Sequence, residues 1–210
     1  MTAINRTAYP YFKPIPSPEE LSELYTPSAA ELELAHEKVR LAPSRLSFLV
    51  LLKSFQRLGY FPKPDAIPEA VILHIRDFLH LEDSIPGIAP EASRYRYYRH
   101  IRRYLNVKRY SSVAKQVATT AIAAAVGVMD HPTDLINVAV ETLVKESYEL
   151  PVFGTLKRLA KHLRAINHTE LYRQVSSQLN LAERDYIDGL IAQPDADVKA
   201  MLNRLKAGQS

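Results

Sequence analysis

The sequence contains no cysteine and no tryptophan, and only 6 of its 210 residues are glycine. The absence of cysteine excludes a disulfide scaffold, a cysteine nucleophile and a thiolate metal site, and it suits a reducing cytoplasm. So few glycines leave little room for phosphate-cradling loops or tight β-hairpins. Hydrophobic residues make up 47% of the chain, which excludes wholesale disorder and indicates one large or two small globular domains.

Motifs of catalysis are also missing. The chain has no Gly-x-Ser-x-Gly, no Walker loop and no dinucleotide fingerprint. None of its 7 histidines is followed by another three or four positions later, so no two-histidine metal site on a helix is predicted. We therefore expect no enzymatic activity, no metal and no cofactor in these residues.

Membrane and secretion signals are missing as well. Residues 1–11 contain one basic residue and no apolar core, unlike a secretory signal. The longest uncharged run, residues 116–129, is shorter than the roughly 20 residues that span a bilayer. We expect a buried helix there, a cytoplasmic protein, no cleaved segment and no membrane partner.

Helical signals run through almost the whole sequence and predict an all-α fold. Ser17 and Ser28 each stand three residues before a glutamate, the pattern of a capping box. A third helix is expected to run from Pro43 to Leu58, with Gly59 as the residue that ends it. Further helices are predicted at about 68–81, 91–106, 111–129, 132–149, 152–166, 169–179, 182–192 and 195–206.

Residues 84–87 combine turn formers with a change from acidic to basic sequence, and we expect a domain boundary there. Short helices joined by short turns suit helix-turn-helix arrangements. The predicted parts are an extended arm of proline and aromatic residues (1–16), a first helical domain (17–84), a second helical domain (88–167) and a helical linker or start of a further domain (168–210).

The net charge of +4 hides strong patterning. Residues 91–115 hold eight basic residues and one acidic residue, and residues 151–182 hold five basic residues and one acidic residue. Acidic neighbours mask these two stretches in the total. Concentrated positive charge of this kind is typical of a surface that binds a polyanion.

The helix expected at 91–106 has an apolar and aromatic face and, opposite it, four arginines at positions 96, 99, 102 and 103. Arginine has the planar fork that suits phosphates and guanine edges. Two alternatives are a solvated face and pairing with acidic residues of the helix at 132–149. The helical spacing of its tyrosines favours core packing over base stacking, while Tyr95 and Tyr110 lie off the apolar face and could contact a nucleic-acid backbone.

Two further basic groups are candidates for phosphate contact. The helix at 152–166 carries lysines and arginines on one face, with a solvated surface as the alternative. A basic turn formed by Lys38, Arg40 and Arg45 precedes the third helix, whose N-terminus would add its dipole. Lys53 and Arg57 lie on one face of that helix. They either contact phosphates too or are simply the solvent-exposed polar side of a core helix. The candidate DNA-binding residues are Arg96, Arg99, Arg102, Arg103, Lys108, Arg109, Lys157, Arg158, Lys161, Arg164, Arg40 and Arg45.

Several segments resemble the N-terminal region of Tn-three-type transposases, the enzymes of replicative class II bacterial transposons. They are 17–21 (SPEEL) followed by Tyr25, 36–48 (HEKVRLAPSRLSF), 57–61 (RLGYF), 94–107 (RYRYYRHIRRYLNV), 150–159 (LPVFGTLKRL) and 203–206 (NRLK). The resemblance extends over most of residues 9–206, in order and at compatible spacing. Ser44 and Ser47 stand where the family often has asparagine and glycine, so no base contact is carried over to position 44.

The resemblance implies a non-catalytic region of a longer transposase. In that family, two helix-turn-helix domains bind the terminal inverted repeats of the transposon as double-stranded DNA. The catalytic Asp-Asp-Glu residues and their Mg²⁺ belong to a distant C-terminal domain that is not in this sequence, so a fragment or a truncated remnant is expected. The resemblance also implies a bacterial, nucleoid-associated protein that could pair with itself through the missing region.

Two other functions remain open from sequence. The basic helix 91–106 could dock on an acidic protein partner, which would make the chain a protein-interaction module. Alternatively, the chain could bind nucleic acids in general, RNA included. An enzyme is the weakest hypothesis for this chain alone.

Overall fold

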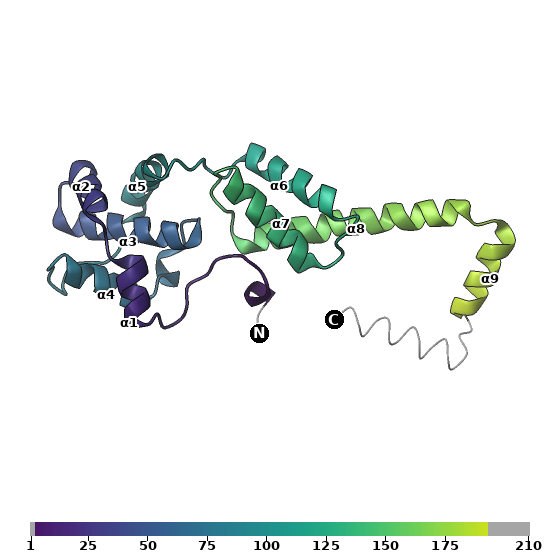
Figure 1. Cartoon of the computed structure of the whole chain (residues 1–210), viewed down its shortest axis with the longest axis horizontal. Helices are drawn as coiled ribbons and strands as arrows, with labels where there is room; N and C mark the ends of the chain where they lie inside the picture. The colour runs from purple at the N-terminus through teal and green to yellow at the C-terminus, as the bar shows by residue number, and fades with distance from the viewer. Residues whose placement is uncertain (1–2, 193–210) are drawn as a thin grey trace. The chain divides into compact units, whose positions relative to one another are not determined.

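The structure, a computed structural model, describes residues 3–192 and consists of helices, turns and loops, as the all-α prediction required. Within these residues there is no strand, only an isolated bridge between Lys108 and Tyr148. The chain divides into two compact units, residues 1–163 and 164–210, which are described separately. The elements of the first unit are η1 (Ala3–Arg6), α1 (Pro18–Glu20), η2 (Leu21–Tyr25), α2 (Ala29–Lys38), α3 (Ala42–Leu58), η3 (Pro64–Ala66), α4 (Glu69–Phe78), α5 (Glu91–Tyr104), α6 (Ser112–Ala125), α7 (Pro132–Lys145) and the beginning of α8 (Phe153–Gln178) (Figure 1).

Both predicted capping boxes are present. Ser17 Oγ accepts a hydrogen bond from Glu20 N at 3.3 Å, and Glu20 Oε2 accepts one from Ser17 N at 3.2 Å. Ser28 and Glu31 make the same reciprocal pair at the start of α2, at 3.3 and 2.7 Å. These bonds satisfy backbone N–H groups that have no partner within the helix, and they fix where each helix begins.

The first core surrounds α3, which is buried on nearly all sides as its apolar run Phe48–Leu52 predicts. α4 packs against it, and so does α5, which inserts Tyr97 and Ile101. The ring of Phe48 meets that of Tyr97 edge to face at 5.7 Å. Burial of each such side chain contributes roughly 1.5–3 kcal/mol, so α5 is held firmly in the first core. The expected boundary at 84–87 therefore does not coincide with the division between cores, which falls between Val107 and Ala114.

The second core lies between α6, α7 and the beginning of α8. α6 and α7 run side by side (Figure 1). Small residues of α6, Ala114 and Ala118, let the two helices approach closely. The N-terminal arm contributes to this core through Tyr9, which is only 2% exposed, whereas Phe12 of the same arm packs against the first core.

Gly59 ends α3, as predicted, in the left-handed conformation with φ of 69°. Its carbonyl accepts a hydrogen bond from Leu150 N at 2.8 Å, and an added Cβ would lie 3.3 Å from Leu150 Cδ1. We expect Gly59→Ala to lower the free energy of unfolding by at least ~1 kcal/mol in urea denaturation. Gly127→Ala is the matched control, because a Cβ there meets open space. Equal stability of the two variants would contradict this account of Gly59.

Lys53 is a structural residue rather than part of an exposed stripe. Its ammonium lies 3.3 Å from Glu31 Oε2, and both side chains are buried. Burial raises the pKa of Glu31, but hydrogen bonds from Ser28 N and Gln56 Nε2, together with the Lys53 charge, outweigh it and leave the pKa below its usual range. Arg57 is exposed, so the predicted solvent-exposed position is correct for Arg57 and wrong for Lys53.

The second unit contains the rest of α8 and α9 (Leu181–Ala192). The predicted helices at 152–166 and 169–179 are one continuous helix, because nothing between them breaks it: Thr169 Oγ1 donates to Ala165 O at 3.0 Å within the helix. Asn180 and Glu183 form a further reciprocal cap at the start of α9. The helix predicted at 195–206 lies outside the described residues. No helix in the described part of the chain is both long and apolar enough to cross a membrane.

Candidate nucleic-acid interface

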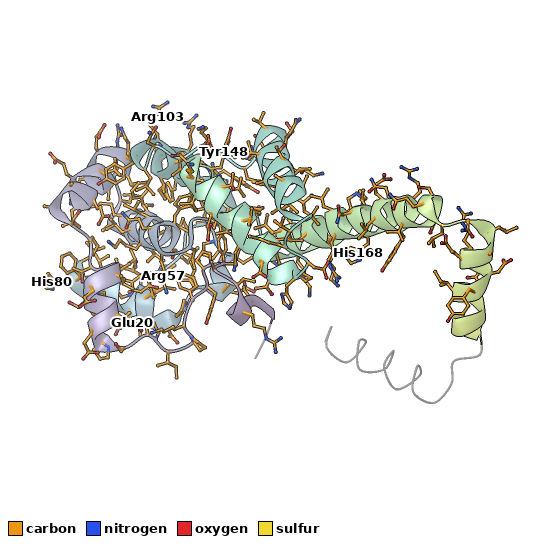
Figure 2. All side chains as sticks on the ribbon, turned by 45° about the vertical axis from the view of Figure 1, so that its right-hand side comes forward. Glu20, Arg57, His80, Arg103, Tyr148 and His168 are labelled. Atoms are coloured by element: carbon orange, nitrogen blue, oxygen red, sulfur yellow. The ribbon has the colours of Figure 1, made fainter. Side chains whose placement is uncertain are left out.

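The predicted arginine face of α5 divides into two parts. Tyr97 and Ile101 anchor the opposite face in the first core, as expected. Arg96, Arg99 and Arg103 are exposed, and within residues 3–192 none of the three forms an ion pair with a carboxylate. Figure 2 labels Arg103, whose side chain points away from the core. Arg102 is different, because it turns toward the protein.

We define the outer basic patch as Lys38, Arg96, Arg99, His100 and Arg103. Four members share α5, and Lys38 ends α2, which packs on α3 as α5 does. In keeping with this grouping, the pKa of His100 lies below its ordinary value. Partial burial is the largest cause, followed by the positive charges of Arg99, Lys38, Arg103 and Arg96. Lys38 comes from the end of α2 and contacts Glu37 at 2.5 Å. Like charges thus gather from two elements and repel one another.

Arg102 is held inside the protein. Its Nε donates to Glu149 Oε2 at 2.8 Å, with 19% and 12% of the two side chains exposed. Its guanidinium also lies 5.0 Å from the centre of the Phe61 ring. The sequence left open whether the arginines of this face bind a polyanion or pair with the acidic segment 132–149. Arg102 does the second, because Glu149 belongs to that segment.

A cleft of about 680 Å³ lies beside α5 in the first unit. Aromatic rings, arginines and the segment that leads into α8 form its walls. The lining residues are Tyr60, Phe61, Tyr95, Tyr98, Arg99, Arg102, Arg109, Tyr110, Glu149, Leu150, Pro151 and Val152. We call it the aromatic cleft.

The rings of the cleft are ordered by stacking. Phe61 and Tyr98 stack at 3.9 Å with 22° between their planes, and Tyr95 meets Tyr98 edge to face at 5.9 Å. Tyr98 is half-buried, whereas 64% of Tyr95 is exposed. Burial raises the pKa of Tyr110, and its hydroxyl oxygen is buried with no hydrogen-bond partner among the described residues.

The linker between α5 and α6 forms one side of this region. Lys108 N donates to Ser147 O, and Glu149 N donates to Lys108 O, both at 2.8 Å. The Lys108 ammonium lies 4.4 Å from the centre of the Tyr148 ring. This anchoring leaves the next residue, Arg109, exposed at the cleft.

The remaining candidates lie elsewhere. On α8, Lys157, Arg158 and Lys161 are exposed, while Leu156 and Ala160 are buried, as the amphipathic pattern predicted. Arg164 lies on the same helix but belongs to the second unit.

The basic turn before α3 is less uniform than predicted. Arg40 is exposed. Arg45 is half-buried, with Nη1 2.6 Å from His36 Nδ1, and its Nε is buried with no hydrogen-bond partner among the described residues. Arg40 is thus open to a ligand, while Arg45 packs against its own chain.

The sequence analysis placed Lys38 in the basic turn before α3 rather than beside α5, and it missed His100, Tyr60 and Phe61 as members of this surface. Lys38 and His100 are distant in sequence and meet only because α2 and α5 both pack on α3. The signal for the two aromatic residues was available, because they directly follow the helix-ending Gly59. No group of three or more potential metal-binding side chains occurs among residues 3–192.

Comparison with known families gave one match. Residues 1–163 match a family described as "Domain of unknown function (DUF4158)". No curated protein matches the sequence. The matched region ends where the first compact unit ends, so it contains both cores, the outer basic patch and the aromatic cleft.

Proposed function

The chain belongs to the DUF4158 family, whose description assigns no function. We propose that it binds double-stranded DNA at transposon inverted repeats, as a non-catalytic part of a transposase. The observation that carries the proposal is the outer basic patch. Its exposed arginines repel one another, and they have no carboxylate partners among the described residues. A phosphate backbone supplies the missing negative charge at regular spacing.

The patch also has the physical form that a duplex requires. Its three arginines are exposed, and they lie on a helix anchored in the first core by Tyr97 and Ile101, so the backbone that carries them needs little ordering when they bind. The exposed Lys157, Arg158 and Lys161 on the second core offer a separate basic surface. Two such surfaces support a bipartite contact with DNA. This agrees with the resemblance to transposases, in which two domains bind the inverted repeats at the transposon ends.

The direct test is the salt dependence of binding. Fluorescence anisotropy of the full chain with a labelled duplex should give an association constant that falls linearly with salt concentration on logarithmic axes, because bound cations release counterions from DNA. An acidic protein should compete poorly with duplex. Absence of duplex binding at low salt, or tighter binding to the acidic protein, would sink the proposal in favour of a protein-interaction module.

His100 makes the proposed binding dependent on pH. In the free protein, burial and the cations around it, Arg99, Lys38, Arg103 and Arg96, lower its pKa. A phosphate on the patch would offset that repulsion and raise the pKa toward its ordinary value. The complex then holds the proton more tightly than the free protein, so affinity for duplex should rise as the pH falls through the interval between the two pKa values, below about 6.5.

His100→Gln is expected to flatten this part of the pH profile, measured by anisotropy at constant ionic strength. The substitution preserves size and hydrogen-bonding capacity but cannot take up the proton. A profile that rises equally in the variant would show that another group is responsible.

A further inference from the structure

We propose that the aromatic cleft binds one unpaired nucleotide of DNA, with its base against the tyrosines and its phosphate between Arg99 and Arg109. The inference rests on the proposed function and extends it from duplex to single-stranded DNA. It would give the protein a means of recognising DNA that is frayed or distorted beside the duplex.

The size and lining of the cleft suit a nucleotide. A volume of about 680 Å³ falls within the roughly 300–1,000 Å³ that small-molecule sites occupy. Tyr95 presents a ring that is 64% exposed, and its hydroxyl donates to Glu91 Oε1 at 3.1 Å, which limits the positions of the ring. Behind it, the stacked pair Phe61 and Tyr98 forms a rigid wall. Exposed, pre-positioned aromatic rings are the usual platform for unpaired bases.

The charge of the cleft favours a phosphate. Its one carboxylate, Glu149, is neutralised by Arg102, so Arg99 and Arg109 remain as uncompensated cations. Pro151 and Val152 line the cleft immediately before α8, whose first N–H groups carry partial positive charge. The Tyr110 hydroxyl adds a buried polar atom without a partner among the described residues.

The arrangement of α5 connects this cleft to the outer basic patch. Tyr95, Arg99 and Arg102 follow one another at intervals of four and three residues, so they share one flank of the helix. Arg96 and Arg103 lie further round the helix, with Arg99 at the junction. A duplex on the patch would therefore have the cleft at its side, within reach of a nucleotide that leaves the stack.

A paired duplex does not explain the aromatic lining. Its bases are stacked on one another and only its phosphates and groove edges meet the protein, so the exposed rings would gain nothing from it. An unpaired base exposes a π-face that can stack on tyrosine. The combination of rings with arginines thus points to single-stranded rather than duplex DNA as the occupant.

The test compares a short oligothymidylate with a duplex of equal length, using the full chain and two cleft variants, Tyr95→Ala and Arg109→Gln. Each variant should weaken oligothymidylate binding by about 10-fold, because stacking or a phosphate contact is lost. Duplex affinity should change much less. The matched controls are Tyr104→Ala, an exposed ring of α5 outside the cleft, and Lys115→Gln, an exposed cation of α6; both should bind like the wild type. Thermal unfolding of each variant establishes that it folds.

A second readout follows from the composition. The chain has 12 tyrosines and no tryptophan, so its intrinsic fluorescence comes from tyrosine and is quenched when a base stacks on an exposed ring. Oligothymidylate should quench the wild type more strongly than it quenches Tyr95→Ala.

The outcomes separate this inference from the proposed function. Duplex binding without oligothymidylate binding, or equal losses for both ligands in the cleft variants, would overturn the cleft proposal and leave the proposed function standing. Tighter binding of an oligouridylate would assign the cleft to RNA and overturn it too. Failure to bind duplex, with oligothymidylate bound, would instead overturn the proposed function.

Discussion

Replacing Lys38, Arg96 and Arg103 together by glutamine is expected to weaken duplex DNA binding on the order of 100-fold near ~0.1 M salt. Three cations of the outer basic patch are removed, and each is expected to contact a phosphate. The slope of log association constant against log salt should fall by about 3 in magnitude, since that many fewer counterions are released. Anisotropy titrations over a range of salt concentrations measure both quantities.

The control has the same net charge. Lys63, Lys115 and Lys145 are exposed lysines of the first unit outside the patch, and their replacement by glutamine changes the charge equally. This variant should keep nearly all of its affinity and its salt slope. If the two triple variants lost affinity equally, binding would depend on net charge, and the patch would have no special role.

Arg102 is deliberately left out of that variant. Removing it would leave the Glu149 carboxylate largely buried without its partner, which lowers the stability of the fold. A loss of DNA affinity in such a variant could then come from partial unfolding instead of a lost contact. Sequence spacing groups it with the other arginines, but the structure gives it a different environment.

Tyr9→Ala is expected to lower the free energy of unfolding by about 3–5 kcal/mol, a large part of the 5–15 kcal/mol typical of a folded domain. The ring is 2% exposed and lies 5.3 Å from Tyr60 and 5.4 Å from Phe153. Its hydroxyl donates to Pro151 O at 2.7 Å. The substitution therefore leaves a cavity and an unpaired carbonyl where the arm joins the second core. Urea denaturation followed by circular dichroism measures the loss.

Two companion variants identify the cause. Tyr11 stands two positions away in the same arm and is 40% exposed, so Tyr11→Ala should cost less than ~1 kcal/mol. Tyr9→Phe keeps the ring and should lose only about 1 kcal/mol with the hydrogen bond. If Tyr9→Ala were no less stable than Tyr11→Ala, the arm would not be part of the core.

Local sequence patterns were sufficient to predict most helices. The capping boxes at Ser17 and Ser28 and the stop at Gly59 depend on a few neighbouring residues, and all three are present as expected. Local patterns also caused the wrong prediction of a break between helices at residues 167–168. The residues there are weak helix formers but not helix breakers, and α8 continues through them.

Tertiary placement could not be predicted in the same way. The position of Tyr9 depends on a contact with Pro151, more than a hundred residues later. The ion pair of Lys53 with Glu31 and that of Arg102 with Glu149 likewise form between helices or linkers, which a helical wheel does not contain. The wheel identified the buried face of α5 correctly, but only the packing of the neighbouring segments shows which flank is open and which borders the aromatic cleft.

The most direct test of the central claim is selection from a pool of random-sequence duplex DNA on the immobilised chain. Our account predicts that one defined sequence is enriched and that it binds at least ~10³-fold more tightly than a scrambled duplex at the same salt concentration. Footprinting on that sequence should protect two adjacent segments, one for each basic surface. Recovery of unselected sequences with equal affinity for all duplexes would contradict sequence-specific DNA binding.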